Sequence, residues 1–146
     1  YWLNSIGTAT MTVTGVADGV PDGSGNRTDM WISLPGNQND GVDEGGWHIV
    51  GYPFNRPMQV DSGAALGDQV FFTDGTTLKN WYEASLMPGA WVDTTLGGFS
   101  PAVGGGFAVV WDGSEGTSTL EPGHGYWLRT YKDNIAMILN AQYSNP

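Results

Sequence analysis

The chain has 146 residues, of which 40% are hydrophobic and only 14% are charged, and its formal net charge is −10. This length supports one domain with a hydrophobic core, and 5 basic against 15 acidic residues argue against nucleic acid or an anionic membrane surface as a partner. Cysteine is absent, which excludes disulfides and thiolate metal sites, and no apolar run is long enough for a membrane-spanning helix, so we expect no membrane insertion.

The residue pattern predicts β structure along nearly the whole chain. Gly (23 residues) and Pro (8 residues) separate short runs rich in Val, Ile, Thr, Tyr, Phe and Trp. We therefore expect an all-β fold, an antiparallel β-sandwich or sandwich-like barrel of about 8–10 short strands, with long Gly-rich loops and little or no helix. In chain order, the expected strands are residues 1–4, 10–14, 29–34, 47–52, 69–73, 77–81, 90–92, 107–111, 125–131 and 135–140.

Turn-forming residues predict how these strands are connected. Asp74-Gly75 and Asp112-Gly113 directly follow apolar runs, so each is a candidate for a two-residue hairpin turn. Residues 81–87 are the only stretch that favours helix, and Pro88-Gly89 ends it after at most two turns. Long loops are expected at residues 18–29, 37–46 and 97–106.

The two ends of the chain share a pattern. Tyr1-Trp2-Leu3 recurs as Tyr126-Trp127-Leu128, at an offset of 126 − 1 = 125 residues, and each triplet precedes a short apolar run, Met11-Thr12-Val13 or Met137-Ile138-Leu139. Such self-similarity is typical of tandem arrays. We therefore expect a segment of a longer precursor, with a single β domain over residues 1–146 in which 1–15 is the tail of a preceding unit and 125–140 the matching tail. The expected contacts with a neighbouring unit are Tyr1, Trp2, Leu3, Met11 and Val13.

Two central motifs resemble a known type of repeat. GWHIVGYPF at residues 46–54, followed by LEPGHGYWL at residues 120–128, resembles the "GWNLIGYPF … L.PG.GYW" β modules of large secreted and cell-surface bacterial proteins. TMTVTG at 10–15 and WISLP at 31–35 also fit the order of that family, whereas His48 in place of Asn and the Gly-rich insert at 97–106 depart from it. The resemblance implies an extracellular β domain of structural or accessory character, with no catalytic residues.

The 7 Trp and 6 Tyr residues leave two uses open. We expect Trp47, Trp111 and Trp127 in the core, because large aromatic side chains fill a domain that has few other bulky residues. Four aromatic residues lie nearer turns and are expected to be exposed, where they would stack on sugar rings or pack against a neighbouring subunit. These candidate carbohydrate-binding residues are Trp31, Trp81, Tyr82 and Trp91.

Alternation within residues 47–50 predicts which side chains share a face. Trp47 and Ile49 lie on one face of the expected strand and His48 and Val50 on the other, and one of the two pairs faces the core. His48 and His124 are the only imidazoles, and each is expected at a surface or edge position. No nucleophile elbow, zinc-protease motif or phosphate loop is present, so we expect no enzymatic activity and no cofactor.

Two loops carry candidate sites, one for a calcium ion and one for an N-linked glycan. Residues 37–44 gather the oxygen ligands that calcium prefers, although Gly41 falls at the fifth position of the loop, and the EF-hand pattern has glycine at the sixth. Bound calcium and a solvated acidic loop both remain open. Asn26 begins an N-glycosylation sequon. The candidate calcium ligands are Asn37, Asn39, Asp40, Asp43 and Glu44.

These features together predict a non-catalytic structural subunit or repeat module of an extracellular or cell-surface assembly. It would form filaments or a coat through β-strand and face complementarity, with copies of itself or adjacent repeat units as partners. The alternative is a carbohydrate-binding module of a larger secreted enzyme or adhesin, with glycans as its ligands.

Overall fold

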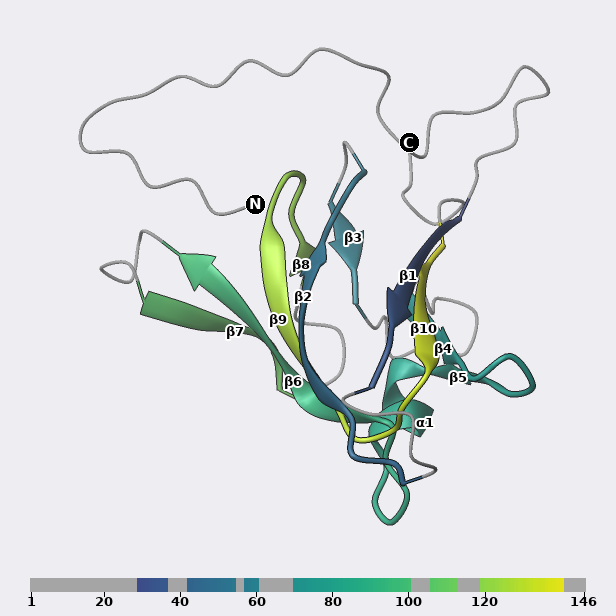
Figure 1. The fold of residues 1–146 in the computed structure, drawn as a ribbon. Coiled ribbons are helices and arrows are strands. Elements are labelled where there is room, and N and C mark those ends of the chain that lie inside the picture. The colour runs from purple at the N-terminus through teal and green to yellow at the C-terminus, as the bar shows by residue number, and fades with distance from the viewer. Residues whose placement is uncertain are drawn as a thin grey trace, which may run out of the picture.

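The computed structural model describes residues 29–36, 42–54, 57–60, 70–100, 106–112 and 119–140. Within these ranges the chain forms ten strands and one short helix, and every strand pair is antiparallel (Figure 1). The expected all-β sandwich is therefore confirmed. Its elements are β1 (Met30–Leu34), β2 (Gly46–Gly51), β3 (Met58–Gln59), β4 (Val70–Thr73), β5 (Leu78–Asn80), α1 (Trp81–Ser85), β6 (Val92–Ser100), β7 (Gly106–Asp112), β8 (Thr119–Leu120), β9 (Gly125–Thr130) and β10 (Ile135–Leu139).

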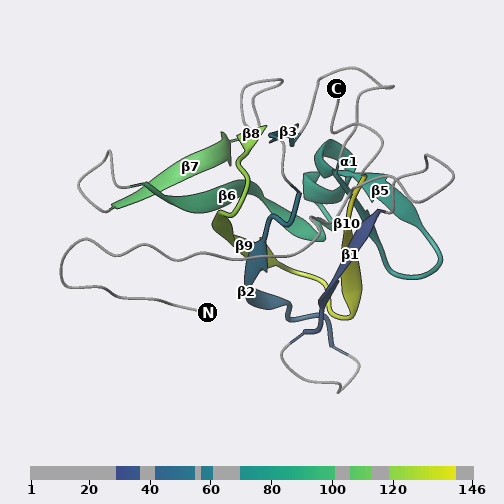
Figure 2. The same cartoon turned by 90° about the horizontal axis from the view of Figure 1, so that it is seen from above.

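The described strands form two four-stranded sheets and one small pair. The first sheet has the order β1-β10-β4-β5, the second has the order β2-β9-β6-β7, and β3 pairs with β8. Figure 1 shows the second sheet on the left and the first on the right, with the chain passing between them from β9 to β10. Both views place the edge strands β1 and β2 next to each other on one side of the sandwich (Figure 2).

The core lies between the two sheets and follows the period-two alternation of the strands. In β9, Tyr126 and Leu128 are buried, while Trp127 between them points to the outer face of the sheet and is half-buried. From the first sheet, Phe72 of β4 and Met137 of β10 are buried in the same core. Buried hydrophobic side chains from both four-stranded sheets therefore meet in one cluster.

The helix α1 begins with a capping box and buries a tryptophan. The Asn80 side chain accepts a hydrogen bond from the Glu83 amide, and the Glu83 carboxylate accepts one from the Asn80 amide. Trp81 packs edge to face on Phe72, with ring centres 5.2 Å apart, and its Nε1 donates to the Asp93 carbonyl. The helical leaning of residues 81–87 is confirmed, although the helix ends at Ser85.

Three expectations about connections need comment. The hairpin at Asp74-Gly75 is confirmed, but Thr73 pairs with Leu78, so the loop has four residues (74–77) in place of two. The expectation of a hairpin at Asp112-Gly113 is wrong for the described strands. The next described strand after β7 is β8, and it pairs with β3 and not with β7. β3 and β8 themselves were not expected, since two-residue strands carry no periodic signal.

The expected loop at residues 97–106 is also wrong in part. β6 continues to Ser100, and β7 begins at Gly106. Gly97 and Gly98 pair with β9 on one side and β7 on the other. Ladder hydrogen bonds on both sides hold these glycines extended, which outweighs their low intrinsic strand propensity. The strands expected at 1–4 and 10–14 lie outside the described residues.

Candidate functional site

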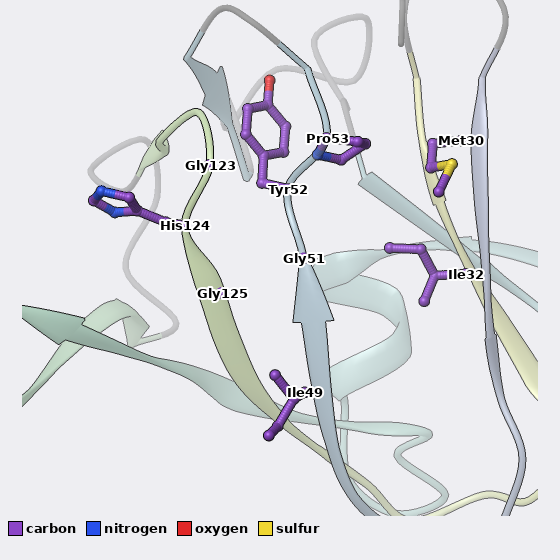
Figure 3. Close-up of a pocket in the computed structure, with 9 residues that line it drawn as sticks. All are labelled: Met30, Ile32, Ile49, Gly51, Tyr52, Pro53, Gly123, His124 and Gly125. Carbon is purple, nitrogen blue, oxygen red and sulfur yellow. The ribbon is translucent and has the colours of Figure 1, made fainter. Parts of the chain in front are cut away.

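An apolar groove lies between the edges of the two sheets. β1 and β2 each pair with one neighbour in the described part of the chain, β10 and β9 respectively, so each leaves an edge open. A cavity of about 520 Å³ runs between them (Figure 3). Its lining consists of Met30, Ile32, Ile49, Gly51, Tyr52, Pro53, Gly123, His124 and Gly125. We call this cavity the edge groove.

Hydrogen bonds between two turns fix one end of the edge groove. The Tyr52 amide donates to the His124 carbonyl at 2.9 Å, and the Gly123 amide donates to the Tyr52 carbonyl at 3.4 Å. Gly123 has φ +74°, a left-handed conformation that glycine adopts without strain. The chain after β2 is thereby attached to the turn before β9.

Tyr52 contributes a buried ring to this end of the groove. Its ring packs edge to face on Phe54, with centres 5.5 Å apart. Burial, followed by the nearby Tyr126 and Glu121, raises the pKa of the Tyr52 hydroxyl far above its ordinary value. The phenol therefore stays neutral at physiological pH and acts through packing and hydrogen bonding.

The chemistry available in the edge groove is that of apolar contact and backbone hydrogen bonding. Its lining contains one exposed titratable side chain, His124, together with aliphatic side chains, Tyr52, proline and bare glycine backbone. Among the described residues no group of three or more His, Asp or Glu side chains is placed to hold a metal ion. An extended apolar peptide segment is the kind of ligand that suits this lining.

The four expected carbohydrate-binding aromatics do not form one surface. Trp31 and Tyr82 are exposed as expected, but Trp31 lies on the edge strand β1, whereas Tyr82 lies on α1, which follows the opposite edge strand β5. The expected exposure of Trp81 and Trp91 is wrong, because they are 1% and 8% exposed. Trp81 is drawn inward by its contact with Phe72 described above.

Trp91 is covered by its neighbours. The Lys79 ammonium lies 4.2 Å from the centre of the Trp91 ring, and the Lys132 ammonium lies 5.6 Å from it. The Trp91 amide donates to the Ala84 carbonyl, and the Trp91 carbonyl accepts from the Tyr131 amide at 2.8 Å. Neither face of this indole is free to stack on a sugar ring.

The expected burial of Trp47 is wrong as well. Trp47 is 64% exposed, and Ile49 on the same face is exposed too, whereas Val50 is buried and His48 is half-buried. The alternation is therefore confirmed, and the smaller pair faces the core. The reason lies in the neighbouring strand, where Leu128 fills the inner position opposite His48. The side chain of Trp111 lies outside the described residues.

His48 faces a polar neighbour at the inner edge of β2. Its Nε2 lies 3.2 Å from the Thr130 hydroxyl oxygen. Burial, followed by the positive charge of Arg129, lowers the pKa of His48 below its usual value. This imidazole is thus mainly neutral at pH 7, in agreement with the edge position expected for it.

Most of the remaining expected site residues lie outside the described residues. This applies to Tyr1, Trp2, Leu3, Met11, Val13, Asn26, Asn37, Asn39 and Asp40. Of the two described calcium candidates, Asp43 accepts a hydrogen bond from the Asp133 amide at 3.1 Å and lies 3.6 Å from the Lys132 ammonium. Glu44 is exposed. The calcium site stays a prediction.

Sequence reasoning did not identify the edge groove. Its residues come from the two motifs that carry the family resemblance and from β1, and the Pro-Gly-His-Gly turn at residues 122–125 was the available signal.

No family model, no curated protein and no solved structure matches the chain. In the part of the chain described above, no helix has the length and apolar character needed to cross a membrane.

Proposed function

We propose that this chain is a non-catalytic structural module of an extracellular or cell-surface assembly, joined to its neighbours by a segment that occupies the edge groove. The observation that carries the proposal is a pair of edges, on β1 and β2, that no described strand occupies and that lie on either side of an apolar cavity. An unpaired sheet edge is a template for another strand, and apolar side chains beside it add burial to the backbone hydrogen bonds.

The terminal repeat supplies the occupant. Residues 1–14 repeat the pattern of β9 and β10, whose Tyr126, Leu128 and Met137 are buried core residues. A segment with the same pattern carries the apolar side chains needed to fill a groove in a second unit. We therefore assign Tyr1, Trp2, Leu3, Met11 and Val13 as the donor residues and the edge groove as their acceptor.

The chemistry of the groove supports a binding role in preference to catalysis. Its lining residues hold no carboxylate, and its tyrosine is kept neutral by burial. The low proportion of charged residues and the resemblance to secreted bacterial β modules support an extracellular location. Protease accessibility of the chain on intact cells of the source organism tests that location.

The assembly proposal is tested by two changes at opposite ends of the proposed contact. Deletion of residues 1–14 removes the donor, and Ile49→Lys places a charge in the acceptor at a side chain that is 51% exposed. Both changes should abolish higher-order species in sedimentation velocity and fibres or sheets in negative-stain images. A mixture of the two variants should form dimers only, because it restores one donor and one acceptor.

Leu78→Lys is the matched control. Leu78 is 57% exposed on β5, the edge strand at the far side of the first sheet, and it does not line the groove. This variant should assemble like the unaltered chain. Unchanged assembly of the deletion variant, or equal loss in the Leu78→Lys variant, would contradict the proposal.

A further inference from the structure

The outer face of the second sheet gathers aromatic side chains around one guanidinium. The register of β2 and β9 places Trp47 opposite Arg129 and Ile49 opposite Trp127. Because Leu128 and Thr130 of β9 are buried on the inner face, Trp127 and Arg129 belong to the outer one. This surface is distinct from the donor segment proposed above and does not depend on it.

Arg129 lies over two aromatic rings. Its guanidinium carbon is 5.9 Å from the centre of the Trp47 ring and 5.8 Å from the centre of the Tyr131 ring. Among the described residues, no carboxylate lies within ion-pair distance of Arg129. The guanidinium is thus held in place by ring faces, and its N–H donors are not taken up by an acidic side chain of the described region.

A carboxylate is positioned at the end of the same row. The Tyr131 hydroxyl donates to Asp93 Oδ2 at 2.6 Å, and the Thr95 amide donates to Asp93 Oδ1 at 3.0 Å. Asp93 lies where the pairing of β6 with β9 shifts register between Val92 and Leu96. Bulges of this kind redirect side chains and are common beside binding sites.

A glycine is the neighbour of Trp127 on β6. Gly97 is the cross-strand partner of Trp127, and a Cβ at this glycine would lie 3.7 Å from the Trp127 Cβ. Any other residue at this position would place its side chain against Trp127, whereas Gly97 adds none.

We infer that this surface binds a neutral polysaccharide. Sugar rings present apolar C–H faces, which suit the faces of Trp47, Trp127 and Tyr131, and hydroxyl groups at their edges, which both donate and accept hydrogen bonds. Arg129 supplies donors, and Asp93 supplies acceptors. The charges of these two residues cancel, which complements an uncharged ligand. We call these five residues the outer aromatic face.

The position of the outer aromatic face argues against a peptide strand as its ligand. β9 is an interior strand, paired with β2 on one side and β6 on the other. Its backbone groups are therefore engaged, and no ladder can be extended there. At β9, recognition must therefore come from side chains, which fits a ligand that stacks and is hydrogen-bonded at its hydroxyls.

The inference is tested with the full chain and insoluble polysaccharides. Microcrystalline cellulose, chitin and starch granules serve as neutral probes, and calcium alginate beads serve as the acidic probe. Depletion of the protein from solution gives the affinity, and quenching of tryptophan fluorescence by soluble oligosaccharides of the retained type confirms stacking. The chain should bind at least one neutral probe and should not bind alginate.

Three substitutions locate the site. Trp47→Ala and Arg129→Gln should each weaken binding at least tenfold. Trp31→Ala is the matched control, since Trp31 is 61% exposed on the edge strand of the other sheet, and it should bind like the unaltered chain. Far-ultraviolet circular dichroism verifies that each variant is folded.

Several results would overturn the inference. These are no binding to any neutral probe, binding to alginate alone, or equal weakening by Trp31→Ala. Loss of self-association in Trp47→Ala without any glycan binding would assign the outer aromatic face to a subunit contact. Failure of glycan binding leaves the edge-groove proposal untouched, because the test of that proposal uses other residues and measures assembly.

Discussion

The Asp133 carboxylate accepts a hydrogen bond from the Gly45 amide at 2.7 Å, and this contact joins the β9–β10 connection to the start of β2. Asp133 is buried, and its own amide donates a hydrogen bond to the carboxylate of Asp43, so two hydrogen bonds join these two segments. Gly45 has φ +63° and is buried beneath Thr130. The residue that precedes the GWHIVGYPF motif, Gly45, is therefore held by a side chain 88 positions away in the sequence.

Substitution of Gly45 should lower the free energy of unfolding far more than substitution of another glycine that also has a positive φ angle. A Cβ at Gly45 would lie 2.1 Å from the Thr130 carbonyl oxygen, whereas a Cβ at Gly75, with φ +87°, meets nothing within 4 Å. Gly75→Ala should therefore lose about 1–2 kcal/mol from left-handed strain alone. Gly45→Ala should lose about 2–5 kcal/mol, because the overlap adds to that strain.

Urea unfolding followed by tryptophan fluorescence measures both glycine variants. The comparison isolates the steric contribution, since both positions require a positive φ. Equal losses in the two variants would mean that the chain at Gly45 moves away from the Thr130 carbonyl without cost, and the start of β2 would then be less rigid than its contacts indicate.

The tryptophans provide a second prediction. Trp81 is buried and Trp47 is exposed, which is the reverse of what the sequence indicated. Trp81→Ala should lower the free energy of unfolding by about 3–5 kcal/mol, since the side chain is buried against Phe72. Trp47→Ala should change it by no more than about 0.5 kcal/mol, because the indole is mainly in solvent.

Thermal or urea unfolding of the two tryptophan variants gives the comparison directly. Tyr82→Ala is a suitable control for α1, because Tyr82 is exposed on the same helix that buries Trp81. A large loss in Trp47→Ala would place that residue in the core after all and would remove it from the outer aromatic face.

Much of the fold could be predicted from period-two alternation and turn residues. β9 and β10 begin at Gly125 and Ile135, where the sequence placed them. Alternation is symmetric, however, and it does not tell which face of a strand is buried. For β2 the size of Trp47 suggested burial, but the inner positions were taken by Leu128 and Thr130 of the neighbouring strand.

The edge groove could not be predicted from local sequence. It exists because β1 and β2 are both edge strands on the same side of the sandwich, and that depends on pairings between residues as far apart as Met30 and Leu139. The capping box at Asn80 and Glu83 was a readable signal for a helix start, and it would have ended the expected strand before Trp81.

The two histidines give a pH prediction with a built-in control. Because the pKa of His48 is lowered in the folded chain, the unfolded chain binds more protons below the ordinary histidine pKa of about 6.5. The stability contribution of neutral His48 is therefore present above that pH and is lost as the pH falls toward the folded-state pKa. Between pH 7.5 and 5.5, His48→Gln should lose less stability than the unaltered chain.

His124→Gln is the matched control for replacing a histidine by glutamine. His124 is exposed on the turn before β9, and the chain has only 2 histidines. Urea unfolding at several pH values between 5.5 and 7.5 measures the slope for each variant, in a range where most carboxylates stay ionised. A smaller slope in His124→Gln than in His48→Gln would mean that the Thr130 hydroxyl stabilises the charged form of His48 by more than burial and the positive charge of Arg129 destabilise it.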